Sequence, residues 1–350
     1  MSLFINNLGI SVFGESHGPC IGITIHNFPS NINIDLARIK KDLSKRSAFT
    51  AGKSPRTEKD EFEIVSGYWR GVTTGAPLTF IIKNKDVDSS AYLANEGIMR
   101  PSHSDYAASI KYHGANDFRG GGHLSGRLTS LYIILGSICQ QQLELQNIIV
   151  TSRVKSLHDI EDDDIIDFEA LSSDLPVYNK QKKQEMIELL ESLSDDSVGG
   201  VIETNISGVK AGIGNPIFNN IESIISYLIF SIPAVKGIEF GKGFGITKLY
   251  GSEANDQMRY KEGKITFLSN NSGGIQGGIT NGNPIVFRTA IKPTPSISKP
   301  QKTINIKNNE SVESVINGRH DKSIVIKAVH VVNAMAAYAI YDILLGEKNG

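Results

Sequence analysis

The chain has 350 residues, of which 40% are hydrophobic and 21% charged, and its formal net charge is −1. This composition predicts a globular protein with a substantial core, and the balanced charge argues against a dedicated nucleic-acid binder. Two cysteines, Cys20 and Cys139, are too few for a disulfide framework, and we find neither a leader nor an apolar run as long as a membrane span. We therefore expect a cytoplasmic protein without a membrane or nucleic-acid partner.

Apolar β-branched runs and helical periodicity alternate along the chain, which predicts a mixed α and β fold. In chain order, the patterns predict a strand over 21–25, a helix over 34–46, strands over 62–71 and 77–84, a helix over 124–145, a helix over 180–193, strands over 199–208, 284–292 and 323–329, and a helix over 328–346 that ends at Gly346. No proline- or serine-rich hinge divides the chain, so we expect one domain over residues 1–350. The acidic, polar segment 157–196 is typical of a surface insertion.

Glycines gather in polar loops instead of scattering over the chain. Examples are "GESHG" (14–18), "RGGGHLSGR" (119–127) and "NNSGGIQGGITNGNP" (270–284). Such loops let the backbone approach a ligand closely. Similar loops occur in both halves of the chain and hint at an internal duplication, although no fixed period supports it.

Cationic residues accompany these loops. Arg100, Arg119 and Arg127 fall within one stretch of 30 residues, and "RGGGHLSGR" leads directly into a predicted helix. Backbone N–H groups at a helix start, with arginines beside them, would form an anion site, although a glycine-rich turn with solvated arginines is the competing interpretation. The same pattern, a cationic residue in a loop, recurs at Arg46 and Lys53, in the "KPTPS" run (292–296) and at Arg319. Together they indicate a small polyanionic ligand, such as a phosphorylated carboxylate or a flavin nucleotide.

Two histidines have a context that suits acid catalysis. His17 and His103 each lie among glycine, proline and serine residues, where a fixed imidazole could act as a general acid. A structural hydrogen bond from a loop histidine is the alternative for each. "GESHG" does not have the GxSxG spacing of a nucleophile elbow. No HExxH or CxxC motif predicts a metal, and no GxGxxG motif predicts a dinucleotide site.

Nine blocks of the sequence resemble the signature blocks of the chorismate synthase family, in that family's order and over nearly the whole chain. They are "FGESHG", "RPSHSDY", "DFRGGGHLSGR", "DSVGG", "VKGIEFGKGF", "GSEAND", "SGGIQGGITNGNPI", "KPTPSI" and "GRHD". The resemblance implies an α+β fold, a β-α-β sandwich with an internal pseudo-two-fold repeat, and a homotetramer. It also implies a lyase that converts 5-enolpyruvylshikimate 3-phosphate into chorismate and phosphate by anti-1,4-elimination, with reduced FMN (FMNH2) required and no net redox change. This is the last step of the shikimate pathway to aromatic amino acids.

The resemblance assigns roles to single residues. It implies that His17 protonates the departing phosphate, that His103 stabilises the reduced flavin, and that Asp321 helps to take up the substrate proton. Matching flavin-binding positions are His123, Leu124, Ser125, Ala254, Asn255, Gly277, Lys292, Pro293, Thr294, Pro295, Ser296 and Arg319. Arg46 matches a substrate- or NADP-binding residue, and the expected further partners are Lys53, Arg100, Arg119 and Arg127.

Two positions depart from the family's pattern. Many members have an arginine and two serines where this chain has "HLS" (123–125), so we expect backbone contacts or a different side-chain bond from His123 and Leu124. Where an arginine is expected six residues after Arg46, this chain has Gly52, and we expect Lys53 to take the place of that arginine.

A flavin-dependent oxidoreductase and a phosphate- or nucleotide-binding module remain alternatives to this function. No added reductase domain is evident, which favours an enzyme without its own NADPH-dependent flavin reductase activity.

Overall fold

In the computed structural model, the described residues are 2–48, 60–85, 87–163, 171, 173–316 and 320–349. Gly52, Lys53 and Arg319 therefore lie outside the described residues. The chain forms two compact units, each assembled from separate stretches of sequence. Unit 1 comprises Met1–Ile134, Gln184–Gly199 and Pro293–Ile324, and unit 2 comprises Leu135–Lys183, Gly200–Lys292 and Val325–Gly350.

Unit 1 is built on a five-stranded antiparallel sheet. Its strands, in spatial order, are β1 (Leu3–Ile5), β2 (Gly9–Gly14), β3 (Cys20–His26), β7 (Leu78–Lys83) and β4 (Phe62–Ser66). Alternate residues of β7 are buried, so Leu78, Phe80 and Ile82 form a core face. The strands predicted over 21–25 and 77–84 are confirmed. The strand predicted over 62–71 is interrupted at Gly67, whose φ of 80° is in the left-handed region, and it continues as the short β5 (Tyr68–Trp69).

The other elements of unit 1 are short, apart from one helix. They are α1 (Leu36–Ala48), β6 (Val72–Thr73), α2 (Ser90–Ala94), α3 (Asp105–Lys111), the 3-10 turns η1 (Arg119–Leu124) and η2 (Gly126–Leu128), and the hairpin of β17 (Gln301–Asn305) and β18 (Glu310–Ser314). The division between the units falls within α4 (Thr129–Glu144) and within α5 (Lys180–Ser192). The helices predicted over 34–46 and 180–193 are confirmed. The one predicted over 124–145 begins at Thr129, because three glycines with positive φ precede it in η1.

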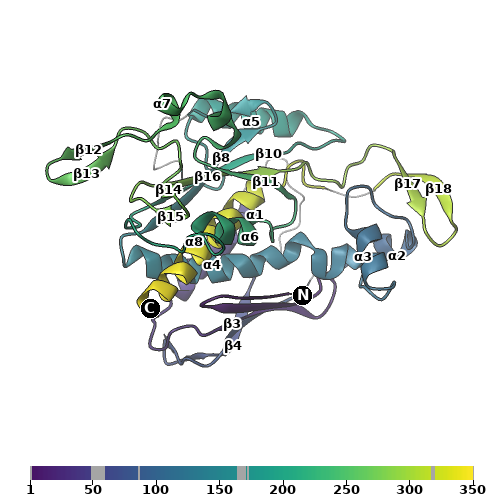
Figure 1. Ribbon diagram of the computed structural model, residues 1–350. Coiled ribbons are helices and arrows are strands. Elements are labelled where there is room, and N and C mark those ends of the chain that lie inside the picture. Colours follow the sequence, from purple (N-terminus) through teal and green to yellow (C-terminus); the bar gives the residue numbers. More distant parts are fainter. Residues whose placement is uncertain are drawn as a thin grey trace. The chain divides into compact units, whose positions relative to one another are not determined.

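Unit 2 contains a second five-stranded antiparallel sheet. Its strands, in spatial order, are β11 (Val235–Phe240), β16 (Ile285–Ile291), β10 (Gly200–Ser207), β8 (Ile149–Leu157) and β9 (Ile160–Glu161). α8 (Val325–Asn349) packs on β8 and β10, and α6 (Ile221–Ile229) packs on α8 and β11 (Figure 1). The strands predicted over 199–208 and 284–292 are confirmed as β10 and β16. An antiparallel sheet of five strands thus occurs in each unit, as an internal repeat requires.

The strand predicted over 323–329 is wrong, because α8 begins at Val325 and includes most of that run. The run is short and apolar, and its burial on all sides hides the difference between a helical and an extended pattern. Gly346 does not end the helix, which continues to Asn349. By length and composition α8 could cross a membrane, contrary to the sequence-based expectation. However, 78% of its apolar stretch is buried, as in the core helix of a globular protein.

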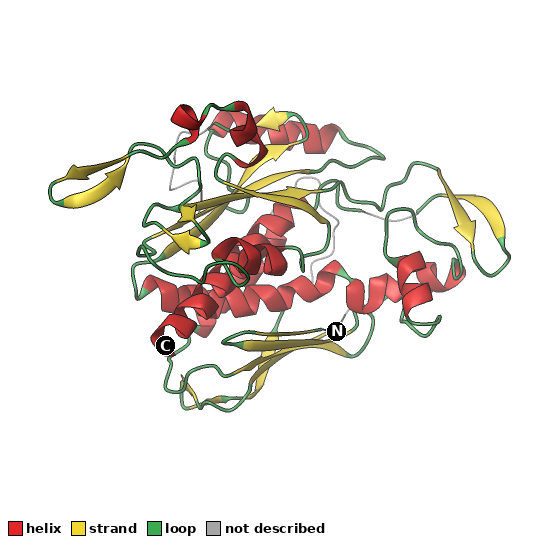
Figure 2. Cartoon of the chain, in the orientation of Figure 1, coloured by secondary structure: helices red, strands yellow, loops and turns green. Residues whose placement is uncertain are grey.

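The remaining elements of unit 2 are a short helix, a 3-10 turn and two hairpins. They are η4 (Gly243–Lys248), α7 (Gly251–Ala254), the pair β12 (Met258–Lys261) and β13 (Lys264–Phe267), and the pair β14 (Ile275–Gln276) and β15 (Ile279–Thr280). The β12–β13 hairpin extends away from the five-stranded sheet of its unit (Figure 2). Two glycines, Gly277 and Gly278, with φ of 63° and 83°, form the tight turn between β14 and β15.

Candidate active site

The "GESHG" segment is a tight turn between β2 and β3, not a compressed catalytic triad. β2 ends at Gly14, whose φ is 94°, and the N–H of Gly18 donates to the carbonyl of Glu15 at 3.0 Å. The side chain of Asn84, which follows β7, donates to the carbonyls of Glu15 and Gly18 at 3.0 and 2.8 Å. The neighbouring strand therefore fixes both ends of the turn that carries His17.

His17 is buried, with 7% of its surface exposed. Its Nδ1 shares a hydrogen bond of 2.9 Å with the hydroxyl of Ser89, and its ring meets Tyr92 edge-on at a centroid distance of 5.2 Å. Ser89 and Tyr92 come from the start of α2. The imidazole is consequently held in one orientation before any ligand binds, which is what a general acid requires.

The glycine-rich turn η1 packs directly against the His17 turn. The hydroxyl of Ser16 donates to the carbonyls of Arg119 and Gly120 at 3.2 and 3.1 Å. A Cβ placed on Gly120 would lie 2.4 Å from Nε2 of His17, so only glycine fits there. The blocks "FGESHG" and "DFRGGGHLSGR", about 100 residues apart in sequence, thus form one structure.

Two of the predicted anion-binding arginines share one carboxylate. Nη1 of Arg127 forms a short ion pair with Oδ1 of Asp60, and Nη1 of Arg46 lies 3.7 Å from Oδ2 of Asp60. The Asp60 side chain is only 6% exposed and also accepts a hydrogen bond of 2.9 Å from the Ser130 hydroxyl. The structure brings these two arginines together around a buried aspartate that the sequence did not reveal.

Arg100 and Arg119 also face carboxylates. Arg119 binds both oxygens of Asp117 at 2.9 Å, and these hydrogen bonds hold the pKa of Asp117 below its ordinary value. Arg100 binds both oxygens of Asp105 at 2.6 and 2.7 Å. Burial raises the pKa of Asp105, but the hydrogen bonds and charge of Arg100 outweigh this effect, so the pKa lies below its ordinary value. Both guanidinium groups are therefore oriented by a carboxylate, although the Arg119 side chain is still 38% exposed.

His103 and the "KPTPS" run meet within unit 1. Nε2 of His103 shares a hydrogen bond of 2.8 Å with the hydroxyl of Ser296. The carbonyl of Thr294 accepts a hydrogen bond of 2.6 Å from Ser197, whereas the buried Oγ1 of Thr294 has no hydrogen-bond partner among the described residues. A buried hydroxyl without a partner is costly unless a ligand supplies a hydrogen bond.

Asp321 is half-buried. It lies next to Lys322, whose carbonyl accepts a hydrogen bond of 2.9 Å from the N–H of Val198.

The "HLS" departure has a structural role. Nδ1 of His123 shares a hydrogen bond of 2.8 Å with the carbonyl of Gly14, within the protein, and a contact of His123 with the flavin stays a prediction. Leu124 is 43% exposed, and the hydroxyl of Ser125 accepts from the N–H of Arg127 at 3.4 Å. The three residues join the end of β2 to the start of the following helix.

The predicted flavin-binding residues of unit 2 lie in ordered loops. The carbonyl of Ala254 accepts a hydrogen bond from the side chain of Asn271 at 3.2 Å, and Asn255 follows at the end of α7. Gly277 is exposed at the β14–β15 turn, with open space where a Cβ would lie. The N–H of Lys292 donates to the carbonyl of Ala234 at 3.0 Å, and burial and the nearby Lys236 lower the pKa of Lys292.

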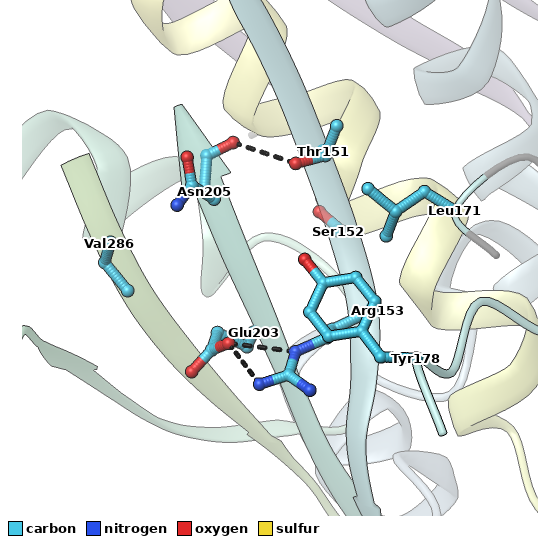
Figure 3. Close-up of a pocket in the computed structure, with 8 residues that line it drawn as sticks. All are labelled: Thr151, Ser152, Arg153, Leu171, Tyr178, Glu203, Asn205 and Val286. Atoms are coloured by element: carbon cyan, nitrogen blue, oxygen red, sulfur yellow. Dashed lines mark hydrogen bonds and ion pairs between the residues drawn. The ribbon is translucent and has the colours of Figure 1, made fainter. Parts of the chain in front are cut away.

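A cavity of about 160 Å³ in unit 2 is not one of the predicted sites (Figure 3). It lies beside Arg153, whose Nε and Nη2 both bind Oε1 of Glu203, at 2.9 and 2.7 Å. Tyr178 lies 4.3 Å from the same guanidinium, and Asp162 accepts from it at 2.7 Å. The arginine is saturated by carboxylates and stacked on an aromatic ring, so it stabilises the sheet instead of offering a free charge to an anion.

Several residues of the candidate site carried no sequence signal of their own. Asp60, Asn84 and Ser89 lie among other polar residues outside the glycine-rich blocks, and each acts on a partner at least 40 residues away in sequence. By contrast, Asp117 lies two residues before Arg119 and Asp105 lies five residues after Arg100, so both of these acidic partners are close to their arginines in sequence.

Comparison with known proteins shows the family to which the chain belongs. A family model described as chorismate synthase matches residues 8–345. The chain belongs to the chorismate synthase family. It is 43% identical over 344 residues to chorismate synthase from Thermococcus kodakarensis, with 97% of each chain covered. The protein of that name from Archaeoglobus fulgidus is 39% identical over 351 residues, with 99% of this chain and 97% of that one covered.

A solved structure described as the crystal structure of chorismate synthase has the same fold, with a TM-score of 0.77 and 28% identity over 99% of this chain and 94% of that chain. Membership of the chorismate synthase family makes the protein a lyase of the last step of the shikimate pathway. The family resemblance and the fold class predicted from the sequence are therefore confirmed.

Proposed function

We propose that the protein eliminates phosphate and a proton from 5-enolpyruvylshikimate 3-phosphate in the anti-1,4 sense and releases chorismate. The observation that carries the proposal is the fixed imidazole of His17 between Ser89, Tyr92 and the glycine turn at Gly120. In this reaction a ring C–O bond breaks toward phosphate, a ring C–H bond loses its proton, and a new double bond forms. A general acid that protonates the phosphate makes it a better leaving group, and His17 is the residue proposed as that acid.

The arginines of unit 1 are proposed to bind the anionic groups of the substrate. Each guanidinium has five N–H donors, and the aspartate partners use only some of them. Arg100 and Arg119 each donate two side-chain hydrogen bonds to one carboxylate, which orients the planar fork. A preorganised fork loses less entropy when it binds a phosphate or carboxylate. Asp321 is proposed to assist removal of the substrate proton.

The residues present fit a flavin nucleotide. In unit 1, the unsatisfied Oγ1 of Thr294 and the His103–Ser296 pair offer polar contacts to such a ligand. The flavin positions expected in unit 2, among them Gly277 and Lys292, stay predictions. Arg319 lies outside the described residues and stays a prediction. When bound, reduced FMN supplies the electron density that assists expulsion of phosphate. His103, held by Ser296, is proposed as the hydrogen-bond donor toward the cofactor.

The test is anaerobic incubation of the protein with 5-enolpyruvylshikimate 3-phosphate and FMN in three states: reduced, oxidised and absent. We expect phosphate and chorismate only with reduced FMN. A flavin-dependent oxidoreductase would release no phosphate, and a binding module would bind FMN without turnover. His17→Ala should lose most of the turnover, roughly 10²-fold or more for a general acid, while FMN binding is kept.

The remaining expectations belong to this proposal. We propose a single functional domain over residues 1–350, a homotetramer in solution and a cytoplasmic location. Lys53 and Arg46 are proposed to contact substrate or NADP. We also propose that the protein lacks flavin reductase activity of its own, so NADPH and oxidised FMN in air should give no chorismate, and measurable turnover under those conditions would contradict this point.

A further inference from the structure

Asn84 occupies a central place in the hydrogen-bond network of unit 1. It is half-buried and directly follows β7, and its backbone N–H donates to the carbonyl of Pro19 at 3.1 Å. Its side-chain Nδ2 donates to the carbonyls of Glu15 and Gly18, the two ends of the turn that carries His17. Its Oδ1 accepts from Nε of Arg127 at 3.2 Å.

The chemistry of these contacts requires an amide. Two carbonyl oxygens need donors and one guanidinium N–H needs an acceptor, so the amide has one favourable orientation. Aspartate could accept from Arg127 but could not donate to either carbonyl. Leucine could do neither. Asparagine is the side chain of this size that satisfies all three partners.

The network continues beyond Arg127. The guanidinium that donates to Asn84 also binds Asp60. Asp60 in turn accepts a hydrogen bond from the Ser130 hydroxyl and lies beside Arg46. The turn of His17 and the arginine pair are therefore joined through one amide. A shift of Asn84 would move the imidazole and a guanidinium together.

We propose that Asn84 is a positioning residue that holds His17 and Arg127 in a single arrangement for the reaction. This inference rests on the proposed function, because it assigns Asn84 an effect through the proton donor and the anion-binding arginine. Asn84 acts on the substrate only through these two residues.

The experiment is a double-mutant cycle in kcat. Asn84→Ala should lower kcat roughly 10²-fold, because a small misplacement of a catalytic group has an effect of that size. In a His17→Ala background, where the proton donor is already missing, the same change should lower kcat much less. Asn84→Asp, which keeps the acceptor for Arg127 but cannot donate to the two carbonyls, should resemble Asn84→Ala in kcat.

A second readout needs no turnover. Carbethoxylation of His17 by diethylpyrocarbonate, followed by peptide mass spectrometry, reports how well the turn protects the imidazole. We expect the rate at His17 to rise several-fold in both Asn84 variants. Asn308→Ala is the matched control, because Asn308 is an exposed asparagine whose side chain donates one hydrogen bond, to Glu310. It should change neither kcat nor the rate at His17.

The outcomes separate this inference from the proposed function. Equal losses of kcat in the wild-type and His17→Ala backgrounds, or an unchanged rate of modification in folded Asn84 variants, would overturn the positioning role even if the elimination occurs. If the wild-type protein does not catalyse the elimination, the proposed function fails, and the modification rate still decides whether Asn84 holds the turn. Thermal unfolding of each variant establishes that it is folded, and Asn84→Asp takes the place of Asn84→Ala if the latter is not.

Discussion

Nε2 of His17 faces the backbone of Gly120 so closely that a Cβ there would lie 2.4 Å away. The hydroxyl of Ser16 reinforces this contact by donating to the carbonyl of Gly120. The glycine of one sequence block therefore lies directly against the histidine of another. Both the position of the imidazole and the conformation of η1 depend on this contact.

Gly120→Ala tests the contact. Alanine at φ 59° is strained by roughly 1–2 kcal/mol, and its Cβ would displace the imidazole. We expect kcat to fall by about 10²-fold or more, with a moderate decrease in the thermal midpoint. Gly126→Ala is the control, because a Cβ at Gly126 has no neighbour within 4 Å. Equal effects of the two substitutions on kcat would contradict the contact.

Ser89→Ala tests the orientation of the imidazole. The substitution removes the hydrogen bond of 2.9 Å to Nδ1 of His17 but leaves the edge-on contact with Tyr92. A net hydrogen bond contributes about 1 kcal/mol, so we expect kcat to fall roughly fivefold with KM little changed. Steady-state kinetics measures both. A rise in KM alone would mean that Ser89 serves binding instead of positioning.

The Arg100–Asp105 pair predicts a pH dependence of stability. The pKa of Asp105 is lowered in the folded protein, so its stabilising contribution is present above the ordinary value of 3.8 and is lost as the pH falls through the lower, folded value. Asp105→Asn should therefore decrease the free energy of unfolding at pH 7, and its difference from the wild type should shrink below about pH 4. Urea titrations of the wild type and the variant at pH 7 and below about pH 4 measure the two free energies of unfolding. A difference between wild type and variant that does not depend on pH would contradict the prediction.

Gly136 allows α4 to approach α8 within unit 2. A Cβ at Gly136 would lie 2.3 Å from Cα of Ala334, so Gly136→Ala should destabilise the protein by about 1–3 kcal/mol. Gly245→Ala is the control, because Gly245 is exposed and has open space at the Cβ position. Urea denaturation compares the two variants. Equal free energies of unfolding would show that the helices tolerate the added methyl group.

The sequence predicted most of the elements in which buried and exposed residues alternate. It failed for elements that are buried throughout or that contain buried charged residues. β8 was missed because the buried Arg153 and Lys155 interrupt its apolar pattern, and their compensation by Asp162 and Glu203 is not visible in sequence. The start of α8 was mistaken for a strand because its residues are buried on nearly every side. Local patterns report exposure, and both cases depend on partners elsewhere in the chain.

For the candidate site, the resemblance named His17 and the arginines but not their supports. The pairing of Arg127 with Asp60 and the bonds of Asn84 join residues more than 40 positions apart, without a local motif at either aspartate or amide. The tertiary structure alone reveals that the predicted cations are preorganised by carboxylates.

The stoichiometry of flavin tests the central claim most directly. Under anaerobic conditions, the protein with reduced FMN and excess 5-enolpyruvylshikimate 3-phosphate should release phosphate and chorismate in equal amounts over many turnovers, while the absorbance of the flavin shows no net oxidation at the end. Oxidation of one flavin for each phosphate released, or no release of phosphate, would contradict the account.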